Sequence, residues 1–103
     1  MSKYRNKPTI IDGIRFMSQK EGARYLELKQ LEKVGLIQDL ELQPVFDCRI
    51  NNAKVCKYLA DFRYRDTKTQ EQIVEDVKGF KTVVYRLKKK LVKALFGVDI
   101  VEV

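Results

Sequence analysis

The residues best suited to chemistry in this chain are Asp61, Asp76 and Lys78, within the stretch 58–79. We interpret this stretch as strands over residues 58–65 and 73–78, joined by a polar turn at residues 66–72. Side chains alternate along a strand, so Asp76 and Lys78 share one face, and Glu75 points away as a structural or surface residue. If Asp61 faces the same side, two carboxylates and an ammonium group converge. Such a cluster can hold a hard divalent cation through its oxygens and place an amine beside an attacking water.

Position 61 is unusual because it lies in the middle of a predicted strand, with apolar residues on both flanks. Residues 53–65 are expected to form one long strand, and a lone aspartate in its middle is disfavoured by propensity and burial. Residues 36–50 are also strand-like, with a bend or an edge position at Pro44. Asn51 and Asn52 form a turn between these segments. The flanking Cys48 and Cys56 could face each other across a hairpin, but without a secretion signal free buried thiols are favoured over a disulfide.

A first helix is predicted over residues 18–34, ended by Gly35, after a short hairpin signal at residues 12–13. Ser18 and Glu21 fit a capping box, which would give Glu21 a purely local role at the helix start. Tyr25 and Leu28 lie on the same helix face as Glu21, so it also sits at the edge of the face that packs on the sheet. A carboxylate there is costly unless a metal or a lysine lies opposite. Both roles of Glu21 are open at this point.

A second helix is predicted over residues 81–96, closed by a glycine and followed by a strand at residues 98–103. Its expected buried stripe consists of Val84, Leu87, Leu91 and Leu95. Lysines and arginines fill the other faces without an acidic residue among them, which favours phosphate contact over a merely solvated face. The expected DNA contacts are Lys81 and a well-exposed set made of Arg86, Lys88, Lys89 and Lys93.

Length and composition set the remaining bounds. The 103 residues are expected to form one domain, with residues 1–9 as a loose basic arm. The absence of histidine excludes a histidine general base and a histidine-ligated zinc ion. The net charge of +7 weakly favours a polyanionic partner. No signal peptide or membrane span is recognised, so a cytoplasmic protein without a membrane partner is expected.

The predicted elements follow the order helix, three strands, helix, strand (α-β-β-β-α-β). A closing strand–helix–strand unit favours a parallel pair and the hairpins favour antiparallel ones, so the predicted fold is α/β, a mixed central sheet flanked by helices. On this frame, Asp61 followed by Asp76-Val77-Lys78 resembles the signature of the PD-(D/E)xK nuclease superfamily. Glu21 resembles the extra acidic residue of its junction-resolving and transposon-end-cleaving branches. The wider pattern resembles small phage-encoded proteins of this superfamily, through FMSQKEGARYLEL, LELQP, YLADFRY, VEDVKGFKT and LKKKL.

The resemblance departs from the signature at one place, since Ala60 stands where the signature has proline, a position at which the superfamily is lax. It implies that Asp61, Asp76 and the main-chain carbonyl of Val77 bind Mg²⁺, which Mn²⁺ can replace. Glu21 would complete or tune this metal site, and Lys78 would position or deprotonate the attacking water. Gln43 and Lys81 are accessory candidates for orienting water or phosphate.

The implied protein is an endodeoxyribonuclease acting on duplex or branched DNA such as Holliday junctions, as a homodimer in the host cytoplasm. One alternative is a nucleic-acid-binding protein that keeps the fold and the basic helix but performs no chemistry. Another is a structural α/β domain whose carboxylates form surface salt bridges. Binding of Mg²⁺ would separate this last possibility from the other two.

Overall fold

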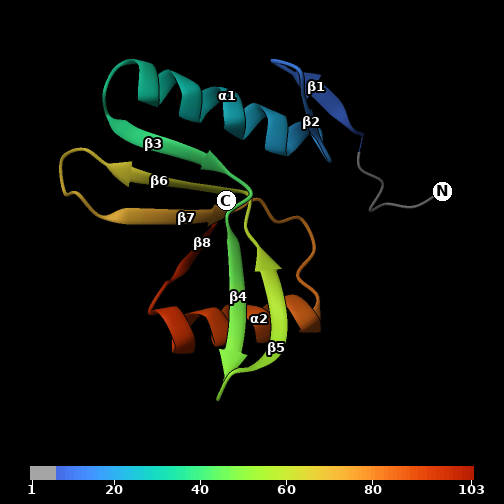
Figure 1. The fold of residues 1–103 in the computed structure, drawn as a ribbon. Coiled ribbons are helices and arrows are strands. Elements are labelled where there is room, and N and C mark those ends of the chain that lie inside the picture. The colour runs from blue at the N-terminus through green and yellow to red at the C-terminus, as the bar shows by residue number, and fades with distance from the viewer. Residues whose placement is uncertain (1–6) are drawn as a thin grey trace.

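The computed structural model describes residues 7–103 and forms a mixed α/β fold (Figure 1). The predicted α/β class with a mixed sheet and flanking helices is therefore confirmed. The described elements are, in chain order, β1 (Thr9–Ile11), β2 (Ile14–Phe16), α1 (Gln19–Lys33), β3 (Ile37–Leu42), β4 (Val45–Ile50), β5 (Ala53–Leu59), β6 (Phe62–Asp66), β7 (Gln72–Asp76), α2 (Val83–Phe96) and β8 (Ile100–Glu102).

The central sheet has the strand order β3-β6-β7-β8. The pairs β3–β6 and β6–β7 are antiparallel, and β7–β8 is parallel because α2 provides the crossover between them. Together with α1, these strands reproduce the predicted order of helix, three strands, helix, strand. The hairpins β1–β2 and β4–β5 form separate ribbons, and Figure 1 shows the β4–β5 ribbon extending from the central sheet across α2.

Apolar side chains form one cluster on each side of the sheet. On the side of α1, Phe62 and Tyr64 of β6 pack with Tyr25 and Leu28 of the helix. On the other side, the cluster comprises Phe46, Cys48, Tyr58, Ala60, Val74, Tyr85, Val92 and Ile100, from the β4–β5 ribbon, β7, α2 and β8. The sheet is thus covered by α1 on one face and by α2 with the β4–β5 ribbon on the other.

The expected single strand over residues 53–65 is wrong, because β5 ends at Leu59 and β6 begins at Phe62. At the break, Ala60 N donates to the carbonyl of Pro44 at 3.1 Å and Asp61 N donates to the carbonyl of Glu75 at 3.1 Å. The chain therefore changes partners here, from the β4–β5 ribbon to the central sheet. A matching break separates β3 from β4 at Gln43, whose φ is +51°, next to the bend predicted at Pro44.

Helix α1 confirms the predicted first helix and its caps. The hydroxyl of Ser18 accepts a hydrogen bond from Glu21 N at 3.1 Å, and Gly35 beyond the C-terminus has a φ of +83°. The β1–β2 hairpin packs so closely on this helix that a Cβ at Gly22 would lie 2.8 Å from the methyl group of Thr9. Because β1 begins at Thr9, the predicted arm ends too late by one residue, and its residues 1–6 lie outside the described residues.

Helix α2 begins at Val83, two residues later than predicted, with Thr82 as its N-cap. Its expected buried stripe is correct for Leu91, which packs against the core cluster, and wrong for the rest. Val84 is 61% exposed, Leu87 is 65% exposed and Leu95 is exposed, whereas Tyr85 and Val92 are buried. Tyr85 takes the buried position instead, where its ring packs in the core and its hydroxyl binds Glu102. Lys88 and Lys89 are half-buried, and their ammonium groups reach polar partners.

The β4–β5 ribbon places Cys48 directly opposite Cys56, and both are free thiols. Cys48 is buried and Cys56 is half-buried, and burial raises the pKa of the Cys48 thiol. Asn51 and Asn52 form the predicted turn, with φ values of +49° and +66°. Among residues 7–103, neither helix is long and apolar enough to cross a membrane.

Candidate functional site

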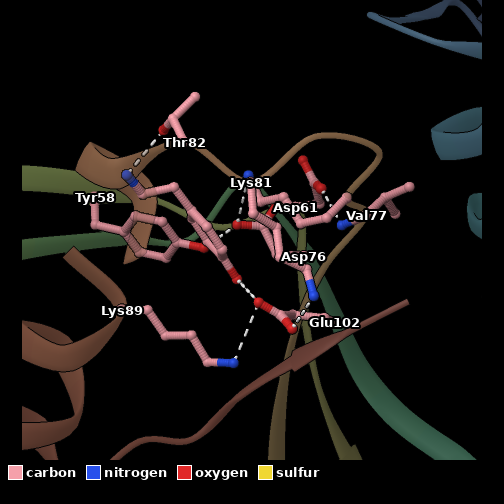
Figure 2. A network of polar contacts seen from close by, with 10 residues as sticks. Tyr58, Asp61, Asp76, Val77, Lys81, Thr82, Lys89 and Glu102 are labelled. Atoms are coloured by element: carbon pink, nitrogen blue, oxygen red, sulfur yellow. Dashed lines mark hydrogen bonds and ion pairs between the residues drawn. The ribbon is translucent and has the colours of Figure 1, made fainter. Parts of the chain in front are cut away.

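The structure gathers the four main candidate residues at one end of the central sheet. Asp61 directly precedes β6, Asp76 ends β7, Lys78 follows β7, and Glu21 lies in the first turn of α1. The Nζ of Lys78 lies 3.3 Å from Asp76 Oδ2. The carboxylate of Asp61 accepts a hydrogen bond from Val77 N at 2.6 Å, which ties it to the segment carrying Lys78 (Figure 2).

Burial is the main cause of the raised carboxyl pKa values in this cluster. The pKa of Glu21 is raised by burial and by repulsion from Asp61 and, to a smaller extent, from Asp76. Burial also raises the pKa of Asp61 and of Asp76, although Lys78 opposes both shifts. One lysine thus does not compensate three carboxylates, and a bound cation would stabilise their ionised forms.

Two tyrosines surround Asp76 and Lys78. The hydroxyl of Tyr58 donates to the Asp76 carboxylate, as Figure 2 shows, and Lys78 Nζ lies 4.1 Å from the centre of the Tyr85 ring. Lys20 of α1 donates to the main-chain carbonyl of Lys78 at 3.1 Å. The sequence did not identify these two tyrosines as site residues, because they occupy core positions. Their hydroxyl groups were the one indication, since a buried tyrosine hydroxyl needs a polar partner and a phenylalanine does not.

A further acidic residue, Glu102 of β8, binds Lys81, which precedes α2, and Lys89, in the middle of α2 (Figure 2). Its carboxylate accepts a hydrogen bond from the Tyr85 hydroxyl at 2.7 Å and pairs with Lys81 at 2.9 Å and Lys89 at 3.2 Å. The hydrogen bond from Tyr85, followed by the contacts from Lys81 and Lys89, lowers the pKa of Glu102 to about 2. Glu102 was not among the predicted site residues, and it holds two lysines predicted to contact DNA.

The remaining basic residues of α2 differ in how freely they are presented. Lys88 and Lys89 are half-buried rather than well exposed, and Lys88 Nζ donates to the carbonyl of Lys57 at 3.1 Å. Lys93 is exposed but paired with Asp99 at 2.8 Å. Arg86 is exposed. The predicted exposed set is therefore correct for Arg86 and Lys93 and wrong for Lys88 and Lys89, because the buried face of α2 is rotated toward them.

A cavity of about 130 Å³ opens beside Glu21 and Asp61. Gln43 reaches this cavity because the break between β3 and β4 directs it there, and its backbone N donates to the carbonyl of Asp61 at 2.9 Å. Arg15 of β2 was not predicted as a site residue and also lines it. The full lining is Ile14, Arg15, Phe16, Glu21, Leu42, Gln43, Asp61 and Phe62.

Glu75 lies on the opposite side of β7 from Asp76, as strand alternation predicted. It is buried rather than on the surface, since only 1% of it is exposed. Its carboxylate accepts hydrogen bonds from Arg24 Nε at 2.8 Å and Nη2 at 2.6 Å, and from the Tyr64 hydroxyl. This arrangement fixes α1, which carries Glu21, against the strand that carries Asp76.

The oxygens of the cluster suit a hard cation such as Mg²⁺, because they belong to carboxylates and to the side-chain amide of Gln43, which lines the same cavity as Glu21 and Asp61. Within residues 7–103, no three acidic, histidine or cysteine side chains are already arranged as a metal site. Glu21 and Asp61 line one cavity, while Asp76 is held by Tyr58 and Lys78. Tyr58 and Lys78 both contact Oδ2 of Asp76, and Met17 N donates to Oε2 of Glu21 at 3.2 Å, so the second oxygen of each carboxylate would have to face a shared cation unless these contacts are exchanged.

Comparison with known proteins places the chain in a family. Neither the curated proteins nor the solved structures contain a match to it. The model of the family described as "Protein of unknown function (DUF1064)" matches residues 1–100. The chain therefore belongs to the DUF1064 family.

Proposed function

We propose that this protein is a Mg²⁺-dependent endodeoxyribonuclease of the PD-(D/E)xK type. The observation that carries the proposal is the convergence of Glu21, Asp61 and Asp76 with Lys78 at one end of the sheet. Residues from α1, from the position before β6 and from the end of β7 and the segment after it, up to 57 positions apart, meet there although burial and repulsion between carboxylates make the cluster costly. Perturbed carboxylates beside an ammonium group are the pattern expected of a site built for chemistry.

Each residue has a defined task in this proposal. Glu21, Asp61 and Asp76 would hold the cation, which when bound supplies positive charge to the phosphate and to the leaving oxygen. The carbonyl of Val77 would be a further ligand, since its amide N already binds Asp61. Lys78, held between Asp76 and the Tyr85 ring, would orient the attacking water toward phosphorus.

The basic residues support DNA as the polyanionic substrate. Arg86 is exposed on α2, and Lys81 and Lys89 would reach phosphates by exchanging their pairing with Glu102. Phosphate contacts of this kind fix orientation on DNA without reading its sequence. A domain of this size with such contacts suits recognition of DNA shape, so branched DNA is the proposed substrate and a homodimer the proposed active form.

One assay tests the function directly. Purified protein is incubated with linear, flapped and four-way-junction DNA in Mg²⁺, Mn²⁺, Ca²⁺ or excess chelator. We expect cleavage in Mg²⁺ or Mn²⁺ and binding with little turnover in Ca²⁺. Lys78→Ala should abolish cleavage, whereas Lys54→Ala, which removes an exposed lysine of β5, should preserve it.

The same assay separates the alternatives. Cleavage that persists in excess chelator removes the metal mechanism. Binding without cleavage in every metal favours a nucleic-acid-binding protein that retains the fold without its chemistry. Absence of both binding and cleavage leaves a structural domain, with Glu21, Asp61 and Asp76 as groups that serve the fold alone.

A further inference from the structure

The cavity beside Glu21 and Asp61 has the size of one planar ring. Its volume is about 130 Å³, and an apolar cavity of about 150 Å³ in another protein accepts benzene. Whole ligand sites are several times larger, at about 300–1,000 Å³. The cavity is therefore suited to a single group of a larger molecule that lies mostly outside it.

The walls of the cavity are apolar and rigid where a ring would lie. Phe16 and Phe62 are buried at 6% and 1% exposure, and Ile14 and Leu42 complete this wall. The β1–β2 hairpin that supplies Ile14 and Phe16 is seated closely on α1 at Gly22. Surfaces of this kind receive the face of an aromatic ring, which is how proteins bind unstacked bases.

The polar groups at the cavity match the edge of a base. The guanidinium of Arg15 and the side-chain amide of Gln43 have no hydrogen-bond or ion-pair partner among residues 7–103. Guanidinium and amide groups are the side chains that proteins use to read base edges. At the other end, the carboxylates of Glu21 and Asp61 would be engaged by the cation of the proposed site, which leaves Arg15 and Gln43 to meet the edge of the ring. Planar donor groups beside apolar walls suit a ring with polar edges.

We propose that this cavity binds one unpaired nucleobase of the DNA, next to the phosphate held at Asp61 and Asp76. The proposal rests on the nuclease function and names its substrate class: DNA with an unpaired nucleotide beside the cut, such as a fork or a flap. A base within a continuous duplex would first have to leave the stack, at a cost of a few kcal/mol. The one-ring volume further predicts that pyrimidines bind better than purines.

The test compares two forked DNAs that differ in one position, an unpaired thymine or an abasic site with the same backbone. Affinity is measured by fluorescence anisotropy in Ca²⁺, with the full chain. Because a stacked base contributes on the order of one to three kcal/mol, we expect the thymine fork to bind about tenfold more tightly than the abasic fork. In Arg15→Ala/Gln43→Ala this ratio should fall close to one. Arg49→Ala, which removes an exposed arginine of β4, should leave the ratio unchanged.

The outcomes of this test distinguish base binding at the cavity from DNA cleavage at the proposed metal site. Equal affinity for the two forks, or a ratio unaltered by the double substitution, overturns the base-binding proposal even if Mg²⁺-dependent cleavage is present. A ratio near tenfold that depends on Arg15 and Gln43 supports base binding. If cleavage is then absent in every metal, the base-binding cavity stands and the nuclease function fails.

Discussion

The buried ion pair between Glu75 and Arg24 provides the strongest prediction about stability. Glu75 is 1% exposed, and both of its carboxylate oxygens are bound, at 2.8 Å and 2.6 Å, by one guanidinium group. The Tyr64 hydroxyl donates to the same carboxylate. Glu75→Gln preserves the shape of the side chain and one acceptor oxygen for Tyr64, but it leaves the charge of Arg24 without its partner.

Removing one partner of a buried ion pair costs about 3–5 kcal/mol of unfolding free energy. The Arg24 side chain is 24% exposed and recovers some hydration in the variant, which places the expected cost near the lower limit. We therefore expect a loss of about 3 kcal/mol, out of a total stability of about 5–15 kcal/mol for such a domain. At about 4–8 °C per kcal/mol, the melting temperature should fall by roughly 12–24 °C.

Urea unfolding followed by circular dichroism measures this loss, and Glu41→Gln is the matched control. Glu41 pairs with Arg63 at 2.7 Å, but the carboxylate is 49% exposed, so its removal should cost less than about 1 kcal/mol. If Glu75→Gln costs no more than Glu41→Gln, the buried pair does not hold α1 against β7. Because Glu75 faces away from Asp76, Glu75→Gln should retain most DNA cleavage at temperatures where it is folded.

Three further outcomes are expected. Asp76→Asn and Lys78→Ala should abolish DNA cleavage while both variants still bind DNA in Ca²⁺. Binding should stay equal or become tighter in Asp76→Asn, since a lost carboxylate no longer repels phosphate. A cleaving Asp76→Asn variant contradicts the assigned site. Glu102→Gln should free Lys81 and Lys89 for phosphate contact, so DNA binding should tighten. The plot of log affinity against log salt concentration should steepen by about one to two units of slope. Unchanged affinity would mean that neither lysine meets phosphate. The folded-state pKa of Glu102 is lowered to about 2 from 4.5, so its stabilising contacts are complete above pH 4.5 and are lost as the pH falls toward 2; Glu102→Gln should remove this part of the acid dependence of unfolding.

Local signals in the sequence were sufficient where one residue determines the backbone. Ser18 and Gly35 define the limits of α1 because a side-chain cap and a left-handed residue act within a few positions of themselves. The turn at Asn51 and Asn52 follows for the same reason. Such features do not depend on what the rest of the chain packs against.

The alternation of apolar residues was misleading where the chain changes the layer against which it packs. Tyr58, Ala60, Phe62 and Tyr64 are all buried, so the alternation continues across the break at residues 60–61. Tyr58 nevertheless belongs to the cluster under α2, and Phe62 belongs to the cluster under α1. Alternation reports that a side chain is buried, but it does not report against which layer, and a single strand was therefore predicted.

The misplaced face of α2 has a related cause. The predicted stripe followed the leucines, because hydropathy ranks leucine and valine above tyrosine and lysine. In the structure Tyr85 is buried through its ring while its hydroxyl binds Glu102, and Lys89 pairs with the same carboxylate. This polar partner lies on β8, outside the helix, and the helical pattern alone contains no information about it.

The position of the candidate site follows from these breaks in the strands. Asp61 and Gln43 lie where two strands leave the central sheet for the β4–β5 ribbon, and Asp76 lies where β7 ends. Polar side chains are tolerated there because the strands separate and an opening forms beside them, whereas the middle of a sheet would enclose them completely. The residues that interrupted the apolar pattern were therefore the informative ones. Asp61 was selected as a candidate from a strand that was predicted wrongly, and the structure places it beside Glu21 at the cavity, because the cost of burying a lone carboxylate holds for either arrangement of the backbone.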